Sequence, residues 1–432
     1  LRSLLPLSQD VQNAHLRNLG RTDLYFLLRY LLKAWYADSD WVFERCREVQ
    51  ANPNGYLDLW AREHFKLFRL DEPVPTPDGW RAHGSLELGD SVFGPDGRTC
   101  RVVARTEVFE APPMHRIKFD DGFEVMAGND HLWEVERRTS KRIPMAYNTD
   151  GPKRLYRERV VITTSDVAAH DHRADNRLSV RVNEPLDLPA ASLPIDPYVL
   201  GVWLGDGASS GARITSGHDD ADEMQALLVA TGIAVSRTTH SNSVSLRLGN
   251  GVRGNRTSSE FMNSIRSLGL YRDKAIPAAY LRASQNQRLA LLQGLMDTDG
   301  SCNTRGTATF TNINDQLVDE FCELAHTLGL KPHRRQHTGF YNGDRRPFWQ
   351  VSFQGYKALP PFRMERKLAR CMDGARPNPR RYIISCEPVE PQPGSCIQVD
   401  RADGLYLVGR NMVTTHNSTI ITYALSIQDI LN

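Results

Sequence analysis

The chain is short of the patterns that mark secreted, disulfide-bonded or membrane proteins. Its seven cysteines, an odd number among 432 residues, are widely spread, and no two of them form a Cys-x-x-Cys pair. This spacing indicates neither a disulfide framework nor a zinc site, and it fits a reducing compartment. The most apolar stretch, residues 24–37, is interrupted by Arg29 and Lys33 and is too short to span a bilayer. No signal peptide pattern is visible, so we expect a cytoplasmic protein with no membrane partner.

The chain also lacks a strong charge of either sign. It carries 53 lysines and arginines against 51 aspartates and glutamates, a formal net charge of +2. This balance neither favours nor excludes a nucleic-acid partner. Basic residues do cluster in residues 331–336, 363–370 and 376–382, and each cluster is equally compatible with a solvated protein surface.

What is present is a nested arrangement of segments. Residues 1–66 show helical apolar spacing, residues 67–175 alternate short β-type runs with turns, and residues 176–385 mix helical and strand-like segments. The β pattern returns in residues 386–417, and residues 418–432 again favour a helix. The predicted fold class is therefore mixed: an all-β domain interrupted by an α+β domain, with short helical segments at both ends.

Two similar motifs, "VLGVWLGDG" and "LQGLMDTDG", lie in the middle segment. Gly201 and Gly294 would let two helices approach backbone to backbone, which would bring Asp206 and Asp299 side by side at the helix ends. Paired carboxylates are hard ligands for Mg²⁺, a metal that assists phosphodiester cleavage. The alternative is two buried helices that end in glycine caps, with each aspartate serving only as a turn residue.

These motifs resemble those of the LAGLIDADG homing endonucleases in their single-chain, two-motif form. The element "KAIP", which contains Lys274, and the segment "FCELAHTLGLKP" are also similar to that family. The resemblance implies two αββαββα halves that form a β saddle on double-stranded DNA. It also implies Asp206 and Asp299 as Mg²⁺ ligands for DNA cleavage and Lys274 as a catalytic lysine. The first motif departs from the family pattern at Leu204 and Gly205.

The flanking β segments resemble the two halves of an intein splicing domain, the HINT fold. The resemblance rests on three blocks in the family's order. "VPTPDGWRAHGSLELGDSVFGPDG" matches the opening block, "GNDHLW" the block with the catalytic His131, and "VTTHNS" the C-terminal junction with His416, Asn417 and Ser418. It implies autocatalytic excision of the segment between two junctions.

The first junction departs from an ordinary intein, which begins with a cysteine or serine. Leu67 stands at the corresponding position. Cys396 in "GSCIQVD", Trp133 in "GNDHLW" and Thr415 in "VTTHNS" together resemble the set found in class 3 inteins, which lack a first-position nucleophile. Taken singly, each of the three is also compatible with an ordinary place in a β core.

The resemblance implies a reaction that starts at Cys396. Its thiol attacks the carbonyl of Lys66 and expels the amine of Leu67, to give a branched thioester. His131 protonates the departing amine.

The remaining steps occur at the second junction. Ser418 takes the acyl group, Asn417 cyclises onto its own carbonyl with assistance from His416, and an O-to-N acyl shift leaves a Lys66–Ser418 peptide bond. We expect no metal or nucleotide in these steps. Leu405 stands near the position where many inteins carry a second histidine.

Removal of residues 67–417 would join "AREHFK" to "ST", which resembles a deviant P-loop with Phe65 in place of its last glycine. Lys66 and Ser418 are therefore candidate ligands of ATP and Mg²⁺ in the joined product. Residues 1–66 look like the start of a phage large terminase subunit, a DNA-packaging ATPase. We expect such a host, of which the chain carries a fragment.

Three alternatives remain open. The α+β domain binds DNA without cutting it; or the chain is a stand-alone nuclease or DNA-binding protein whose β flanks only hold the saddle; or splicing follows the ordinary route from another first residue. For that last route the nearest cysteine and serine are Cys46 and Ser85. In each case we expect a monomer.

Overall fold

The structure, a computed structural model, describes residues 18–19, 22–26, 47, 66–142, 153–249, 260–341, 344–374 and 379–417. The helical ends predicted from the sequence lie almost entirely outside this part of the chain, with α2 (Leu24–Phe26) inside it. Ser418 also lies outside it. Among the described residues, no helix combines the length and the apolar character needed to cross a bilayer.

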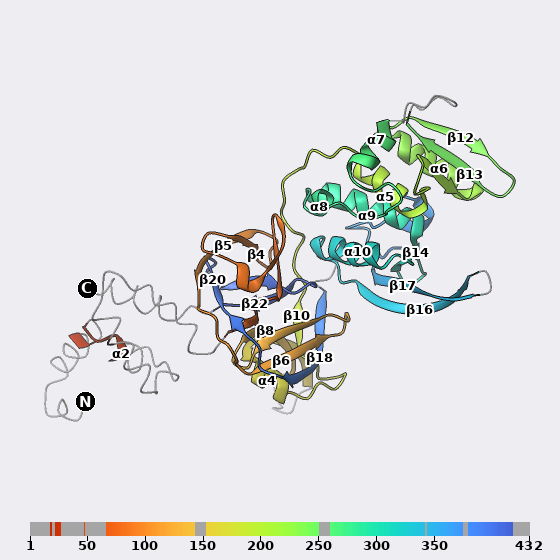
Figure 1. Cartoon of the computed structure of the whole chain (residues 1–432). Helices are drawn as coiled ribbons and strands as arrows, with labels where there is room; N and C mark the ends of the chain where they lie inside the picture. The colour runs from red at the N-terminus through yellow and green to blue at the C-terminus, as the bar shows by residue number, and fades with distance from the viewer. Residues whose placement is uncertain are drawn as a thin grey trace, which may run out of the picture.

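The two β segments of the sequence form one domain around an eight-stranded sheet, with strand order β19-β1-β7-β6-β18-β10-β8-β9 (Figure 1). In that order the strands span Gly394–Ser395, Phe68–Arg69, Glu124–Gly128, Met114–Phe119, Arg380–Val389, Ser179–Arg181, Leu132–Arg142 and Lys153–Thr163. Strands from late in the sequence, β19 and β18, thus lie beside strands from early in it.

Three smaller sheets complete the β domain. They comprise β20 (Ile397–Val399), β5 (Thr99–Arg105) and β4 (Ser91–Phe93); β2 (Pro73–Thr76) with β3 (Gly79–Ala82); and β21 (Leu405–Val408) with β22 (Val413–His416). In β5, Cys100, Val102 and Ala104 are buried and the residues between them are exposed, as the two-residue period of a strand requires. Helix α4 (Thr164–Ala169) begins at a capping box formed by Thr163 and Asp166.

The inserted α+β domain consists of two halves. The first half contains α5 (Pro197–Asp206), β11 (Arg213–Ser216), α6 (His218–Val229), β12 (Val235–Thr239), β13 (Val244–Leu248) and α7 (Glu260–Ser267). The second half contains α8 (Ala278–Leu281), α9 (Gln285–Asp299), β14 (Gly300–Cys302), β15 (Thr307–Asn312), α10 (Asp315–Thr327), β16 (His333–Tyr341), β17 (Asp344–Gln354) and α11 (Glu365–Leu368). The sheets have the orders β11-β13-β12 and β14-β15-β17-β16. The predicted mixed fold class is confirmed.

The expected limits of the inserted domain, residues 176–385, fall close to two strands that belong to the eight-stranded sheet. Strand β10 pairs with β8, and β18 pairs with β6. The hydrophobic core of the α+β domain contains buried residues from Ile195 to Cys371. The domain limits remain a proposal. Because β10 and β18 pair within the eight-stranded sheet, we propose that the inserted domain lies between these two strands.

Candidate functional site

The predicted first junction lies at the edge of the eight-stranded sheet. Strands β1 and β19 are antiparallel, with Phe68 opposite Ser395. One further step of this register places Leu67 opposite Cys396. Leu67, Cys396 and Met114 also share one buried cluster. The tertiary structure therefore brings the candidate nucleophile to the residue that follows the candidate scissile bond.

Cys396 is held by its backbone and shielded from water. Its N–H donates to Oγ1 of Thr106 at 3.0 Å, and its carbonyl accepts the Thr106 N–H at 3.0 Å. Only 3% of the residue is exposed. Burial raises the pKa of the thiol to about 12, and the Lys66 ammonium acts in the opposite direction. At neutral pH the thiol is protonated, so a nearby base is needed to activate it.

His131 is fully buried and contacts residues of both junctions. Its Nε2 is hydrogen-bonded to Oγ1 of Thr415, and its ring lies 4.2 Å, centroid to centroid, from that of Phe68. Burial holds the pKa of His131 well below its ordinary value, while the Lys66 backbone opposes this shift. The imidazole is therefore neutral at physiological pH and is able to accept a proton.

The ring of Trp133 packs against the ring of His131. The two rings are 4.9 Å apart, and Nε1 of Trp133 donates to Oγ1 of Thr164 at 2.9 Å. The backbone N–H of Thr164 in turn donates to the carbonyl of His131 at 2.8 Å. Trp133 and Thr415 thus position the imidazole, and neither is placed here as a nucleophile.

Asn417, at the second candidate junction, is 1% exposed, and its side-chain amide is held at both ends. Its Nδ2 donates to the carbonyl of Gly404 at 3.1 Å, and its Oδ1 accepts from the N–H of Val399 at 2.7 Å. Gly404 has a φ of +63°, and a Cβ at this position would lie 2.3 Å from the amide atom of Asn417 that faces Gly404, which is Nδ2 in this orientation. Only glycine leaves room for the amide here.

The backbone carbonyl of Asn417 meets two nitrogen groups. Nζ of Lys66 donates to this oxygen at 2.8 Å, and Nδ1 of His416 also contacts it. The pKa of His416 is lowered, chiefly by burial and then by the Lys66 charge. Leu405, which stands where a second histidine was expected, pairs with His416 in the β21–β22 ladder.

Six predicted residues lie together in this buried region: Cys396, His131, Trp133, Thr415, His416 and Asn417. Ser418 lies outside the described residues, so its predicted part stays a prediction. Sequence reasoning missed Thr106, Gly404 and the place of Lys66 beside Asn417. The "DG" turn at Gly404 is visible in the sequence, but the contact that makes its glycine necessary is not.

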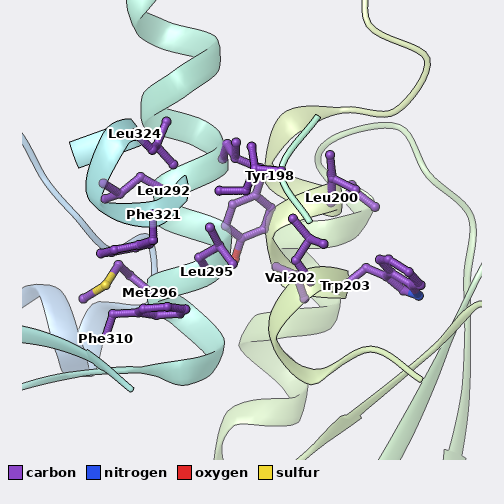
Figure 2. Close-up of a cluster of buried hydrophobic side chains, with 14 of the residues drawn as sticks. Tyr198, Leu200, Val202, Trp203, Leu292, Leu295, Met296, Phe310, Phe321 and Leu324 are labelled. Carbon is purple, nitrogen blue, oxygen red and sulfur yellow. The ribbon is translucent and has the colours of Figure 1, made fainter. Parts of the chain in front are cut away.

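A second candidate site lies where helices α5 and α9 cross with their backbones in contact (Figure 2). A Cβ on Gly201 would lie 2.3 Å from the carbonyl oxygen of Leu291, and one on Gly294 would lie 2.3 Å from that of Tyr198. These distances agree with the backbone approach predicted from the paired motifs.

The departure of the first motif at Gly205 has a packing reason. A Cβ on Gly205 would lie 1.9 Å from Oγ1 of Thr298 on the other helix. A side chain at position 205 would therefore push the helix ends apart. Leu204 is buried in the core of the domain.

Asp206 and Asp299 end the two helices, and the pKa of each carboxyl is raised. Burial raises the pKa of Asp299 to about 6, and the charge of Asp206 adds to this shift. Burial also raises the pKa of Asp206, while Lys274 counteracts both shifts. Because a divalent cation would relieve the repulsion between two such carboxylates, the residues present fit a metal. Among the described residues, no group of three or more His, Cys, Asp or Glu side chains could hold a metal by itself.

Two further side chains order this site. Nζ of Lys274 donates to the carbonyl of Gly205 at 2.7 Å, and Nδ2 of Asn312 donates to Oδ2 of Asp299 at 2.7 Å. Burial lowers the pKa of Lys274, and the charges of Asp299 and Asp206 oppose this shift. Asn312, at the end of β15, was not predicted from the sequence, since its partner is fixed only by the sheet.

The sheet of the second half has one apolar face and one open polar face. Ala308, Phe310, Val351 and Phe353 are buried against the helices. By strand alternation and register, the opposite face carries Thr307, Thr309, Thr311, His333, Arg335, His337, Gln350, Ser352 and Gln354. A hollow of about 520 Å³ lies on this face.

The sheet of the first half is built in the same way. Ile214 and Leu246 are buried, and the alternate residues of the paired strands face outward: Arg213, Thr215, Ser236, Thr238, Ser245 and Arg247. The two sheets flank the α5–α9 pair (Figure 1). Both sheets therefore expose polar and basic side chains, as a surface for a polyanion requires.

The basic cluster in residues 363–370 has side chains that bind other groups of the same domain. In residues 363–370, Nζ of Lys367 donates to the carbonyls of Asp297 at 2.7 Å and Gly300 at 2.6 Å, which satisfies the end of α9. Arg366 pairs with Asp220. Lys367 is buried and needs these partners, whereas Arg366 is exposed and pairs with a carboxylate at the surface, so this cluster is not an unpaired basic surface.

Comparison with known proteins gives two kinds of match. Residues 286–388 match the family model described as "LAGLIDADG-like domain". The chain is 33% identical over 368 residues to the replicative DNA helicase DnaB of Mycobacterium intracellulare. This alignment covers 82% of the chain and 59% of the helicase. A second alignment, to DnaB of Mycobacterium leprae (strain TN), is 43% identical over 80 residues and covers 18% of the chain and 13% of the helicase. The chain thus spans less than two thirds of these relatives.

Among solved structures, the crystal structure of the MchDnaB-1 intein is 14% identical and aligns with 81% of this chain and 99% of its own, at a TM-score of 0.26. The homing endonuclease I-DmoI in complex with DNA and Mn is 17% identical and aligns with 37% of this chain and 89% of its own, at a TM-score of 0.26.

The relatives correct one prediction. They are replicative helicases, so the predicted phage terminase host is wrong. The motif that suggested it lacks both glycines of a P-loop, and a Lys-Ser pair alone does not distinguish one nucleotide-binding protein from another. Residues 286–388 thus carry a LAGLIDADG-like domain within a chain similar to mycobacterial DnaB.

Proposed function

We propose that the chain excises residues 67–417 by autocatalytic splicing and joins Lys66 to Ser418. The observation that carries this proposal is the meeting of the two junctions, 351 residues apart in sequence, in one buried site. Cys396 packs beside Leu67, and the backbone carbonyl of Asn417 accepts a hydrogen bond from Lys66. Groups held this close react as parts of one molecule, which lowers the entropic barrier of each step.

The first step is an acyl transfer to Cys396. Its sulfur forms a bond to the carbonyl carbon of Lys66, and the bond to the nitrogen of Leu67 breaks. The thiol proton passes by way of neutral His131 to the released amine of Leu67. The product is a branched thioester, and Ser418 then takes the acyl group while the thiol of Cys396 is restored.

The second step frees the segment. Nδ2 of Asn417 forms a bond to its own carbonyl carbon, and the peptide bond to Ser418 breaks with transfer of the Nδ2 proton to the Ser418 amine. His416, in contact with that carbonyl oxygen, assists the proton transfer. The acyl group then moves from oxygen to nitrogen on Ser418, and a peptide bond results.

The intact mass of the expressed chain tests this function. The natural chain should yield a free fragment of residues 67–417 and a ligated product, and Cys396→Ala should remain whole at the first junction. Cys100→Ala is the matched control, because Cys100 is a buried thiol of the same domain whose pKa is also raised to about 12 by burial. Splicing of Cys396→Ala at the natural rate would show that another nucleophile is used. Unchanged mass in every chain, including Asn417→Ala, would favour a stand-alone DNA protein.

For the α+β domain, we propose site-specific cleavage of double-stranded DNA. The two open sheet faces would bind the duplex, and Asp206 and Asp299 would hold a divalent metal, which when bound activates water and stabilises the leaving oxygen. DNA phosphates and water would complete the ligand set. Lys274 lies near both carboxylates, where its ammonium offsets their charge and can hold a proton near the leaving group.

A domain that only binds DNA is the main alternative. Asp299→Asn keeps the hydrogen-bonding shape and removes the charge, so it should abolish Mg²⁺-dependent cleavage and leave DNA affinity within about threefold. If the natural chain binds a DNA duplex from an uninterrupted host gene but never cuts it with Mg²⁺ or Mn²⁺, the binding-only alternative holds.

The host is proposed to be a replicative DNA helicase, from the similarity to DnaB. Nucleotide binding by Lys66 and Ser418 in the joined product, a cytoplasmic location and a monomeric state stay predictions.

A further inference from the structure

Lys66 occupies a place that the splicing steps above leave without a chemical reason. It belongs to the flank before the first junction, yet its ammonium is buried and donates to the Asn417 carbonyl at the second junction, at 2.8 Å. Only 2% of the residue is exposed. A lysine ammonium is costly to bury, so its position beside a carbonyl oxygen is a defined arrangement of the fold.

The oxygen that Lys66 contacts is the atom on which negative charge develops when Asn417 cyclises. Nδ1 of His416 contacts the same oxygen, and the attacking amide is fixed by Gly404 and Val399. Two nitrogen groups therefore face one oxygen in a site with little water. Preorganised donors of this kind stabilise an oxyanion more strongly than water does.

We propose that Lys66 is a catalytic residue of the second cleavage in the chain whose Lys66–Leu67 bond is intact, in which its ammonium stabilises the oxyanion formed on Asn417. The proposal rests on the proposed splicing function. In the step itself, the bond from Nδ2 to the carbonyl carbon forms and the electron pair of the C=O bond moves onto the oxygen that faces Lys66. The pair then returns as the bond to Ser418 breaks, and the Nδ2 proton leaves with the Ser418 amine.

This assignment has a consequence for where the segment can splice. Because Lys66 remains with the host, the excised segment carries only part of its own oxyanion site. A host that lacks a lysine before the first junction would support the second cleavage poorly. The residue before the first junction, Lys66, would therefore contribute to the second cleavage as well as to the host protein.

Two assays separate the junctions. In the Cys396→Ala chain only the second cleavage can occur. Its rate is measured from the amount of residues 418–432 that is released. In the Asn417→Ala chain the second cleavage is blocked, so the first acyl transfer is measured alone. Hydroxylamine releases residues 1–66 whether the acyl group is on Cys396 or has moved to Ser418, and the released fragment is identified by its mass. Lys66→Met, Lys66→Arg and the control Lys357→Met, at an exposed lysine of the inserted domain, are placed in both backgrounds.

We expect Lys66→Met to slow the second cleavage about 100-fold, the loss that removal of one oxyanion donor produces, and to slow the first transfer by less than about tenfold. Lys66→Arg should retain most of the second cleavage, since a guanidinium still donates. Lys357→Met should change neither. A Lys66→Met chain that cleaves at the second junction within about twofold of its parent overturns the proposal, and so does equal loss at both junctions, which indicates misfolding. If the parent itself releases nothing at the second junction, the splicing function fails and this inference with it.

Discussion

At the scale of single residues, the proposed splicing site contains two neutral groups, the thiol of Cys396 and the imidazole of His131, between which the proposed first step transfers a proton. Burial raises the pKa of Cys396 to about 12 and holds that of His131 well below its ordinary value. Between those two values the resting pair is thiol plus neutral imidazole. Transfer of the proton to His131 gives a thiolate and an imidazolium with the same total number of protons. The rate of the first step should therefore not depend on pH in this range.

A pH profile tests this pairing. In the Asn417→Ala chain, the first acyl transfer, measured by the hydroxylamine quench at fixed pH, should change less than about threefold between pH 6.5 and 8.5. In His131→Ala no base accepts the proton, so the rate should follow the thiolate fraction. Because the thiol pKa lies above this range, that fraction rises about tenfold for each pH unit. A natural profile that already rises tenfold per unit would mean that His131 is not the base.

Gly404 offers a second test at the same scale. Gly404→Ala would place a Cβ 2.3 Å from the amide atom of Asn417 that faces Gly404, the attacking Nδ2, and should displace it. We expect the second cleavage in the Cys396→Ala background to fall at least about 100-fold, because misplaced reacting atoms lose that much rate. The first transfer should change little.

The matched control for this variant is Gly89→Ala. Gly89 also has a positive φ, +89°, in the β domain, but a Cβ there would meet no atom within 4 Å. It therefore carries the backbone strain without the clash. Equal loss of the second cleavage in both variants would assign the effect to strain and not to the amide.

At the scale of elements, the contact of α5 with α9 determines where the two aspartates lie. Asp196 caps α5, and Ser284 with Gln287 forms a capping box at the start of α9, so both helices begin at defined residues. Gly201 and Gly294 then let the backbones touch. Caps and glycines together bring the helix ends, and hence the carboxylates, side by side.

Gly201→Ala should separate these helices. Its Cβ would lie 2.3 Å from the backbone oxygen of Leu291, which cannot rotate away as a side chain can. Overpacking of this kind costs about 1–3 kcal/mol or more of the free energy of unfolding. We expect that loss in urea unfolding of the Cys396→Ala chain, together with reduced DNA cleavage.

Gly217→Ala is the control for that measurement. Gly217 precedes α6 in the same domain, has an ordinary φ, and would place its Cβ in open space. It should change the free energy of unfolding by about 0.5 kcal/mol or less. If Gly201→Ala is as mild as this control, the helix contact is looser than the structure describes.

At the scale of the whole molecule, buried polar contacts join the two domains. Arg381 of β18 forms a fully buried ion pair at 2.7 Å with Asp121 within the splicing domain, and from there its guanidinium lies 2.9 Å from Nδ1 of His326 in α10 of the inserted domain. Nδ2 of Asn183 donates to the carbonyl of His326 at 3.2 Å. The splicing and inserted domains thus share buried, partnered groups at their boundary.

Arg381→Met should leave the Asp121 carboxylate buried without its partner. Loss of one member of such a pair costs about 3–5 kcal/mol, so unfolding of the Cys396→Ala chain should shift by that amount. Adding Asp121→Asn should restore part of the loss, because no unpaired charge remains. Arg380→Met, beside it, removes a half-exposed partner of Glu136 and should cost about 1 kcal/mol or less. A loss for Arg381→Met no larger than this would show that the buried pair stabilises the domain boundary no more than an exposed pair does.

The nested order of segments, the paired glycine–aspartate motifs and the residue types at both junctions could be predicted from the sequence alone. These follow from short-range information: strand alternation, helical spacing, caps and motif order are properties of neighbouring residues. The identity of the host could not be predicted from the sequence. The few residues around Lys66 carry too little information, so the terminase prediction was wrong.

Which distant residues meet depends on the tertiary structure. The register of β1 with β19 brings Cys396 to Leu67, the pairing of β21 with β22 brings Gly404 to Asn417, and the fold places Lys66 on the Asn417 carbonyl. It also turned Lys367 inward to the end of α9, although its sequence neighbourhood suggested a basic surface. Such contacts depend on the balance of burial, hydrogen bonding and charge over the whole chain, and local sequence does not encode that balance.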